Sequence, residues 1–278
     1  IAFIMTPKED VAGHSEVTLQ LAKQEHAEHM EGMQEATDEM RQRPMIVKAF
    51  SLDDSKAPSG EKVKTIHFVR HGQGFHNLMA DRAKQAGQEW VNFTKTTANP
   101  YYMAEILDAP LTEKGRQQAM ALQPTVRDME NQPELVVFSP NCRALQTGVL
   151  VFEHLKHKIP FIAHEMVREE NGVHVCDKRR PKSRQIQEFP SVNFDLLETE
   201  EDVLFYEDKR ETKVEVARRV YKFLEWLETR EETHIGVASH SAWLLTAFNA
   251  NFECDESLKG WFQTGEMRSA VVEFTRTQ

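Results

Sequence analysis

Short apolar runs alternate with segments of helical periodicity from residue 64 to the end of the chain. The runs are rich in Val, Ile and Phe, and they predict strands at residues 64–69, 135–138, 159–163, 234–238 and 270–274. Apolar residues at helical spacing predict helices that begin at Thr112 and that cover residues 143–152 and 214–228. This alternation is typical of one α/β domain in which helices cover a sheet.

The first 60 residues follow a different pattern. Residues 15–40 are dominated by Glu, Gln, Met and His with only a thin apolar stripe, which predicts a polar helix. Pro44 is expected to stop this helix, and residues 51–60 have the Ser, Asp, Pro and Gly content of a linker or turn. We therefore divide the chain into a helical and irregular N-terminal extension, residues 1–60, and a main domain, residues 61–278.

Two histidines of the predicted polar helix, His26 and His29, can share one face and could in principle ligate a metal ion. No third ligand is apparent nearby in the sequence. The interpretation we favour is that both side chains are solvated, and no metal site is predicted.

The charge balance narrows the classes of partner. The chain has 34 basic and 44 acidic side chains, a formal net charge of −10 with histidine neutral. Nucleic acids and anionic membranes need a basic face, so we expect neither as a partner. Three scattered cysteines do not make a secreted disulfide framework, which favours a reducing, cytoplasmic location. No apolar stretch approaches the roughly 18 residues of a membrane-spanning helix.

The segment directly after the first predicted strand carries the strongest chemical signal. It contains Arg70, His71, Gly72 and Gly74, and the two glycines allow backbone amides to approach an anion. Ligands of open α/β sheets bind at the carboxyl ends of strands. A cation beside a nucleophilic histidine is therefore expected to line a site at this turn.

Three other predicted strands are followed by similar groups. Arg143 comes after residues 135–138, Glu169 and Glu170 come after residues 159–163, and His240 comes after residues 234–238. If the sheet brings these strand ends together, two arginines, two histidines and a glutamate converge on one anion-sized pocket. Packing alone does not explain that combination.

These residues belong to a longer series of motifs in the same order along the chain. The motifs are Arg70-His71-Gly72 with His76-Asn77, Leu111-Thr112-Glu113-Lys114-Gly115, Ser139-Pro140 with Arg143, Arg168-Glu169, Cys176-Asp177-Lys178-Arg179-Arg180, Ser239-His240-Ser241 and Glu266 with Arg268. In this series the chain resembles the histidine phosphatase superfamily, also called phosphoglycerate mutase-like. Within it, the chain is most similar to the phosphoglycerate mutase-like proteins of plants and fungi.

The resemblance implies a three-layer α/β/α sandwich with a mostly parallel central sheet, and a phosphatase that uses neither a metal nor another cofactor. His71 would attack phosphorus and become a phosphohistidine. Arg70 and Arg143 would bind the phosphoryl oxygens, and His240 would complete the ring of donors. The residues expected to contact the substrate are Gln73, Gly74 and Asn77.

The leaving alkoxide needs a proton, and the resemblance assigns its donor to a carboxylic acid at the position of Glu169. The neighbouring Glu170 has the same chemistry and stays open as the alternative. The same carboxylate would activate water when the phosphohistidine is hydrolysed.

Residues 178–184 are strongly basic in an otherwise acidic chain. The simpler interpretation is a solvated loop. The alternative is that Arg179 or Arg180 reaches over the pocket and selects a substrate with a second anionic group. Three other side chains, Trp243, Trp261 and Phe262, are interpreted as core rather than as a platform for a nucleobase.

Mechanisms from other families fit the sequence less well. Gly72 and Gly74 faintly resemble a dinucleotide-binding fingerprint, but Asn77 stands at the third glycine position. A cysteine-dependent phosphatase needs an arginine six residues after the cysteine, and Lys182, Gly148 and Gly260 occupy those positions. No Walker-type Gly-Lys-Ser/Thr element is present.

Two rivals remain within the resemblance. A cofactor-dependent phosphoglycerate mutase would use the same pocket, but such mutases carry Glu-Ser where this chain has Gln73-Gly74, so we favour a phosphatase. A pseudophosphatase that uses residues 1–60 for docking is the non-enzymatic rival. The expected partner is a small phosphate ester, and a homodimer stays open.

Overall fold

The computed structural model describes residues 16–58, 60, 62–88, 90 and 99–276. Within these ranges seven strands form one sheet in the order β4-β3-β5-β2-β7-β1-β6. The strands are β1 Met45–Ser51, β2 Val63–Arg70, β3 Leu135–Phe138, β4 Phe161–Ala163, β5 His234–Ser239, β6 Phe252–Cys254 and β7 Met267–Arg276. Only β7 runs antiparallel to its neighbours, β1 and β2. The sheet is therefore mostly parallel, as predicted.

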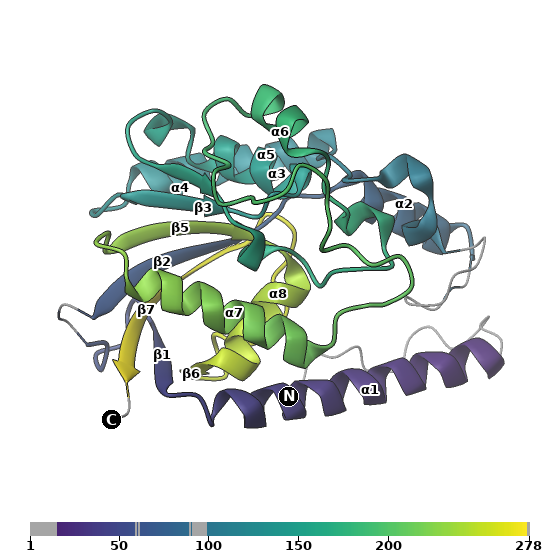
Figure 1. Cartoon of the computed structure of the whole chain (residues 1–278), viewed down its shortest axis with the longest axis horizontal. Coiled ribbons are helices and arrows are strands. Elements are labelled where there is room, and N and C mark those ends of the chain that lie inside the picture. Colours follow the sequence, from purple (N-terminus) through teal and green to yellow (C-terminus); the bar gives the residue numbers. More distant parts are fainter. Residues whose placement is uncertain (1–15, 59, 61, 89, 91–98, 277–278) are drawn as a thin grey trace.

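Helices cover both faces of this sheet (Figure 1). In chain order they are α1 Glu16–Met40, α2 Phe75–Gln85, α3 Glu113–Ala121, α4 Gln123–Arg127, α5 Cys142–Val151, α6 Lys182–Glu188, α7 Lys213–Glu228 and α8 Ser241–Thr246. The helices α3, α4 and α5 lie on one face, and α1, α7 and α8 lie on the other (Figure 1). The three-layer α/β/α sandwich is confirmed.

Alternating side chains of the strands supply two separate cores. In β3, Leu135 and Val137 pack into the core under α7 and α8, whereas Val136 and Phe138 pack into the core under α3 and α5. All four β3 side chains are buried. Because both faces of the central strands are buried, their sequences are short continuous apolar runs and do not alternate between apolar and polar residues.

The helix predictions are confirmed where local signals are strong. The Thr112 hydroxyl accepts a hydrogen bond from the Gly115 amide at 3.1 Å and caps α3. In α7, Thr212 and Glu215 form a capping box, and one apolar face of the helix is buried in the core.

The N-terminal extension contains one element that the sequence analysis did not predict. The polar helix is present as α1, but Met45–Ser51 forms β1 inside the central sheet, paired with β6 and β7. Its residues Met45, Val47 and Ala49 are buried, an alternation too short to stand out beside Pro44 and the polar linker. Part of the extension is therefore integral to the sheet, while the boundary at residue 60 stays a prediction.

The structure also tests the predictions about the buried aromatic residues and about membrane-spanning helices. Trp243 and Phe262 are buried as predicted, but Trp261 is 41% exposed, so its assignment to the core is wrong. No helix in the described ranges combines the length and apolar character needed to cross a membrane. All three cysteines are unpaired.

Candidate active site

The predicted site residues gather where β2, β3 and β5 end. The parallel register places Arg70 opposite Ser239, and Phe138 opposite Ala238. The turn after β2, the start of α5 after β3 and the start of α8 after β5 therefore meet at one edge of the sheet. The segment after β4 carries Glu169 to the start of α8, where the Ala242 amide donates to its carboxylate.

His71 lies at the centre of this cluster and is only 1% exposed. Its Nδ1 is 2.7 Å from the carbonyl oxygen of Gly72. A carbonyl only accepts, so Nδ1 carries the proton and Nε2 keeps its lone pair. Burial, with the positive charges of Arg143 and Arg70, holds the pKa of His71 well below its usual value, so the ring is neutral near pH 7.

Three imidazole rings meet at His71. Its ring centroid lies 5.1 Å from that of His240 and 5.4 Å from that of His76. His240 Nε2 is 2.7 Å from the hydroxyl oxygen of Ser139. Burial, with Arg143 and His71 nearby, also lowers the pKa of His240 and of His76 well below the usual value. The sequence analysis noted His76 in a motif but gave it no role.

Two guanidinium groups complete the cluster. Arg70 donates to the carbonyl of Phe262 at 2.6 Å, and Arg143 donates to the Cys176 carbonyl and to Asp177 Oδ1, both at 2.6 Å. The structure also contains buried nitrogen atoms beside His71 that have no hydrogen-bond partner within the described ranges. These atoms are Arg70 Nε, Arg143 Nε, His76 Nδ1 and His240 Nδ1. Buried nitrogens with unused hydrogen-bonding capacity, two of them on cations, are suited to an anion.

The turn after β2 is held by its own neighbours. The Gly72 amide donates to the Thr147 hydroxyl at 3.0 Å, and a Cβ on Gly72 would overlap the carbonyl of Gly115. The Gln73 amide donates to the Gln118 side chain at 2.8 Å. The close contact with Gly115 explains why the two glycine motifs occur together.

Three residues expected to contact the substrate have protein partners. The Gln73 side-chain oxygen accepts from the Thr112 hydroxyl at 2.9 Å, and the Gly74 amide donates to the Asn77 side chain at 3.0 Å. Gly74 also makes room for the His76 ring, which a Cβ would overlap. These contacts shape the turn, and a direct contact of these residues with substrate stays a prediction.

The two neighbouring glutamates lie in different surroundings. Glu169 Oε1 accepts from the backbone amides of Glu170, Ala242 and Trp243 at 3.0–3.1 Å, and Oε2 accepts from the Ser241 hydroxyl at 3.1 Å. Glu170 instead forms ion pairs with Lys213 and, at 3.4 Å, with Arg210. Burial opposes its ionisation, but Lys213 and Arg210 lower the pKa of Glu170. Glu170 is therefore a fixed anion.

The two arginines of the basic segment that were predicted as candidates for substrate binding have protein partners. Arg179 is 3% exposed, and each of its three nitrogens donates to protein oxygens, among them Glu165 and the carbonyls of Thr199 and Glu200. Arg180 pairs with Glu188 at 2.8 Å and lies 3.8 Å from Asp108. The interpretation as a solvated loop is wrong for Arg179, which is buried, and a contact of Arg179 or Arg180 with substrate stays a prediction.

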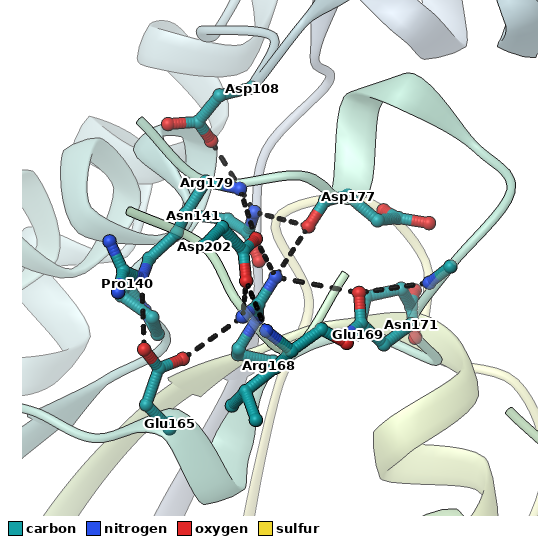
Figure 2. A network of polar contacts seen from close by, with 12 residues as sticks. Asp108, Pro140, Asn141, Glu165, Arg168, Glu169, Asn171, Asp177, Arg179 and Asp202 are labelled. Carbon is teal, nitrogen blue, oxygen red and sulfur yellow. Dashed lines mark hydrogen bonds and ion pairs between the residues drawn. The ribbon is translucent and has the colours of Figure 1, made fainter. Parts of the chain in front are cut away.

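Arg179 belongs to a buried network beside the cluster, with Arg168 at its centre (Figure 2). Arg168 donates to Asp202 at 2.5 and 2.8 Å, to Glu165 at 3.1 Å and to the Asp177 carbonyl at 2.9 Å. Asp177 in turn pairs with Arg143 and, at 2.7 Å, with Arg210. The sequence analysis noted Asp177 only as part of a motif, and the structure makes it the link between this network and Arg143.

Tyr101 is a second residue that the sequence analysis missed. Its ring stacks on His174 with centroids 4.7 Å apart and lies 6.5 Å from the His76 ring. Nothing in the local sequence distinguishes it.

Across the part of the chain that the structure describes, no group of three His, Cys, Asp or Glu side chains could hold a metal ion.

Comparisons with known proteins show what this chain is similar to. Residues 66–278 match the family model described as histidine phosphatase superfamily (branch 1). Phosphoglycerate mutase-like protein 1 of Arabidopsis thaliana is 35% identical over 244 residues, which cover 76% of this chain and 82% of that protein. Phosphomutase-like protein 3 of Candida albicans is 30% identical, covering 69% of this chain and 61% of that protein.

A solved structure of phosphoglycerate mutase from Bacillus anthracis is 16% identical, with a TM-score of 0.49, and covers 78% of this chain and 92% of that one. The family match contains every predicted site residue and begins after α1 and β1.

Proposed function

The chain belongs to the histidine phosphatase superfamily, and on that premise we propose that it is a metal-independent phosphatase that hydrolyses a phosphate monoester through a phosphohistidine on His71. The observation that supports this most directly is the hydrogen bond between His71 Nδ1 and the Gly72 carbonyl. It leaves Nε2 as a lone-pair donor among buried nitrogens for which the described residues supply no hydrogen-bond partner.

In the first step, His71 Nε2 attacks phosphorus and the phosphorus–oxygen ester bond breaks. Arg70 and Arg143 bind the phosphoryl oxygens and stabilise their charge. Ser139 can donate its hydroxyl proton to His240 Nε2, in which case His240 Nδ1 carries a proton that it donates to the same oxygens. Positioning and charge stabilisation supply most of the catalysis in such a transfer.

The departing oxygen takes its proton from Glu169. Three backbone amides occupy Oε1, so Oε2 is the oxygen that carries the proton. In the second step water attacks phosphorus, its proton passes to Glu169, and the phosphorus–nitrogen bond breaks. Phosphate leaves, and both His71 and Glu169 return to their starting forms. Glu170 is disfavoured as the acid because Lys213 and Arg210 hold it as an anion.

The second candidate is a cofactor-dependent phosphoglycerate mutase, as the names of the relatives suggest. A mutase must hold a second anionic group of its substrate. Arg179 and Arg180 face Glu165, Asp108 and Glu188 instead, which supports the phosphatase. A pseudophosphatase is disfavoured because the nucleophile, the arginines and the acid are all present.

The expected partner is a small phosphate ester. The three unpaired cysteines support a reducing compartment, and we propose the cytoplasm.

The test is phosphate release from a panel of esters in the presence of EDTA, with an aryl phosphate, an alkyl phosphate and 3-phosphoglycerate with its bisphosphate cofactor. We expect release that His71→Ala lowers by at least about 10⁴-fold, since removing a nucleophile has effects of this size. Wild type and variant should unfold at similar temperatures.

Two outcomes would contradict the phosphatase. Exchange between 3- and 2-phosphoglycerate without phosphate release would make the protein a mutase. Turnover that survives His71→Ala, or that EDTA abolishes, would exclude the metal-independent phosphohistidine mechanism.

A further inference from the structure

The C-terminal part of α1 is packed against the rest of the protein through one face of the helix. Towards its C-terminal end, Ala36 and Met40 are buried in the core, and the Thr37 hydroxyl is 3.3 Å from the Asn249 carbonyl. Glu39 pairs with Arg218 of α7 at 2.7 Å. This part of α1 is anchored on α7 and the segment after α8, as Figure 1 shows.

The same face continues one and two turns earlier with Gly32 and His29, at helical spacing from Ala36. Gly32 faces Lys213, since a Cβ built on it would lie 3.5 Å from the Lys213 Cγ. The His29 ring stacks on Trp261 with centroids 6.1 Å apart and planes inclined by 29°. Burial and Lys213 lower the pKa of His29 to about 4, so it packs as a neutral ring.

These two contacts lead to two different residues of the candidate site, Glu169 and Arg70. Lys213 pairs with Glu170, whose backbone amide donates to Glu169 at 3.0 Å. Trp261 precedes Phe262, whose carbonyl accepts from Arg70 at 2.6 Å. One helix face therefore touches the support of the acid and the support of a phosphate-binding arginine.

We infer that α1 is an active-site element: Gly32 packs against Lys213 of the Lys213–Glu170 pair, and His29 is a positioning residue that holds the Trp261–Phe262 segment, so that Glu169 and Arg70 stay aligned. The roles of Arg70 and Glu169 rest on the proposed function. The family match begins after α1, so this support is an addition outside the matched region. Its expected consequence is a change in anion affinity and turnover rather than in folding.

The test compares His29→Ala with His26→Ala in the full chain. His26 lies on the same helix but is exposed, so it controls for the loss of a histidine from α1. We expect His29→Ala to lower kcat/KM roughly tenfold, since small displacements of catalytic groups have effects of at least this size. The affinity for orthovanadate, a phosphate mimic, should fall by a similar factor, and His26→Ala should match the wild type in both.

His29→Phe keeps a neutral ring against Trp261 and should restore most of the lost activity. In a double-mutant cycle, His29→Ala combined with Trp261→Ala should cost no more than the larger single loss, because both changes break one contact. Melting temperatures of all five variants should stay within about 2 °C of the wild type.

The outcomes separate this inference from the proposed function. If His29→Ala equals His26→Ala in turnover and vanadate affinity, or if the two losses in the cycle add, the inference is overturned while His71-dependent hydrolysis stands. If no ester is hydrolysed but His29→Ala still weakens vanadate binding, the proposed function fails and the positioning role stands. A wild type that binds no vanadate would overturn both.

Discussion

Two groups of buried arginines lie side by side at the edge of the sheet and differ in what surrounds them. The anion cluster consists of Arg70, His71, His76, Arg143 and His240. The ion-pair cluster consists of Glu165, Arg168, Arg179 and Asp202 (Figure 2).

In the ion-pair cluster two cations face two carboxylates at 2.5–3.1 Å. In the anion cluster Arg70 donates to a carbonyl and Arg143 pairs with Asp177 at 2.6 Å. Four buried nitrogens there have no partner in the described ranges, against one, Arg168 Nε, in the ion-pair cluster. Burial and ion pairing alone therefore do not distinguish the two groups, whereas the nitrogens without a partner do.

The largest effect that would sharpen this comparison comes from removing one arginine from each cluster. Arg168→Met leaves Asp202 buried without its partner, and we expect the free energy of unfolding to fall by about 3–5 kcal/mol. Arg143→Met should cost less stability, because Asp177 keeps Arg210. It should lower kcat/KM by roughly 10²–10³-fold, as expected for a donor to the transition state.

Urea unfolding and phosphate release would measure both effects. An Arg143 variant that is as unstable as the Arg168 variant would remove the distinction between the clusters.

The next effect concerns the two glutamates that adjoin both clusters. Glu169→Gln should slow hydrolysis of an alkyl phosphate by about 10²-fold and that of an aryl phosphate much less, because only the poor leaving group needs the proton. Glu170→Gln is the matched control: it should lower stability, since Lys213 loses its partner, and any loss of turnover should be equal for the alkyl and the aryl ester. Equal losses for alkyl and aryl esters in Glu169→Gln would contradict the assignment of the acid.

A smaller effect is the dependence of protein stability on pH, which should differ in its pH range between the two clusters. His71, His76 and His240 have pKa values held well below 6.5 by burial and Arg143. As pH falls below about 6.5, the unfolded chain takes up protons that the folded chain does not, so stability falls by about 1.4 kcal/mol per pH unit for each histidine. His71→Gln should reduce the slope by that amount.

The ion-pair cluster should respond only in stronger acid. Burial opposes ionisation of Asp202, but the hydrogen bond from Arg168 lowers the pKa of Asp202 below 3.8. Its contribution to the free energy of unfolding is present above pH 3.8 and is lost as pH falls through the lowered value.

Urea unfolding between pH 7 and 5 would check the prediction for the three histidines. If His71→Gln left the slope of stability against pH unchanged, the neutral state of His71 would be contradicted.

The smallest effect tests whether the basic segment stands apart from the anion cluster. Arg180→Gln should change KM by less than about twofold, for neutral and for doubly anionic esters alike, because Glu188 and Asp108 neutralise its guanidinium. Steady-state kinetics on both ester classes would measure this. A KM that rises only for doubly anionic esters would place Arg180 in the substrate pocket.

The sequence by itself determined the central strands, the helix that Thr112 caps and four of the five residues of the anion cluster, all except His76. Each depends on local information: apolar runs at residues 64–69 and 135–138, the cap at Thr112, and reactive groups directly after strands. Because parallel strands end at one edge of a sheet, Arg70, His71, Arg143 and His240 are brought together once the strands are known.

Tertiary structure alone decided the surroundings of residues that are alike in sequence. Glu169 and Glu170 are adjacent and chemically identical. Glu170 nevertheless pairs with Lys213, which is 43 positions away, whereas Glu169 accepts hydrogen bonds from the start of α8. The same holds for Arg179 and Arg180, for the strand β1, which exists only by pairing with β6 and β7, and for His29 against Trp261. Ion pairs, strand edges and ring contacts form between residues that are distant in sequence, and no local pattern records which partner the fold brings near.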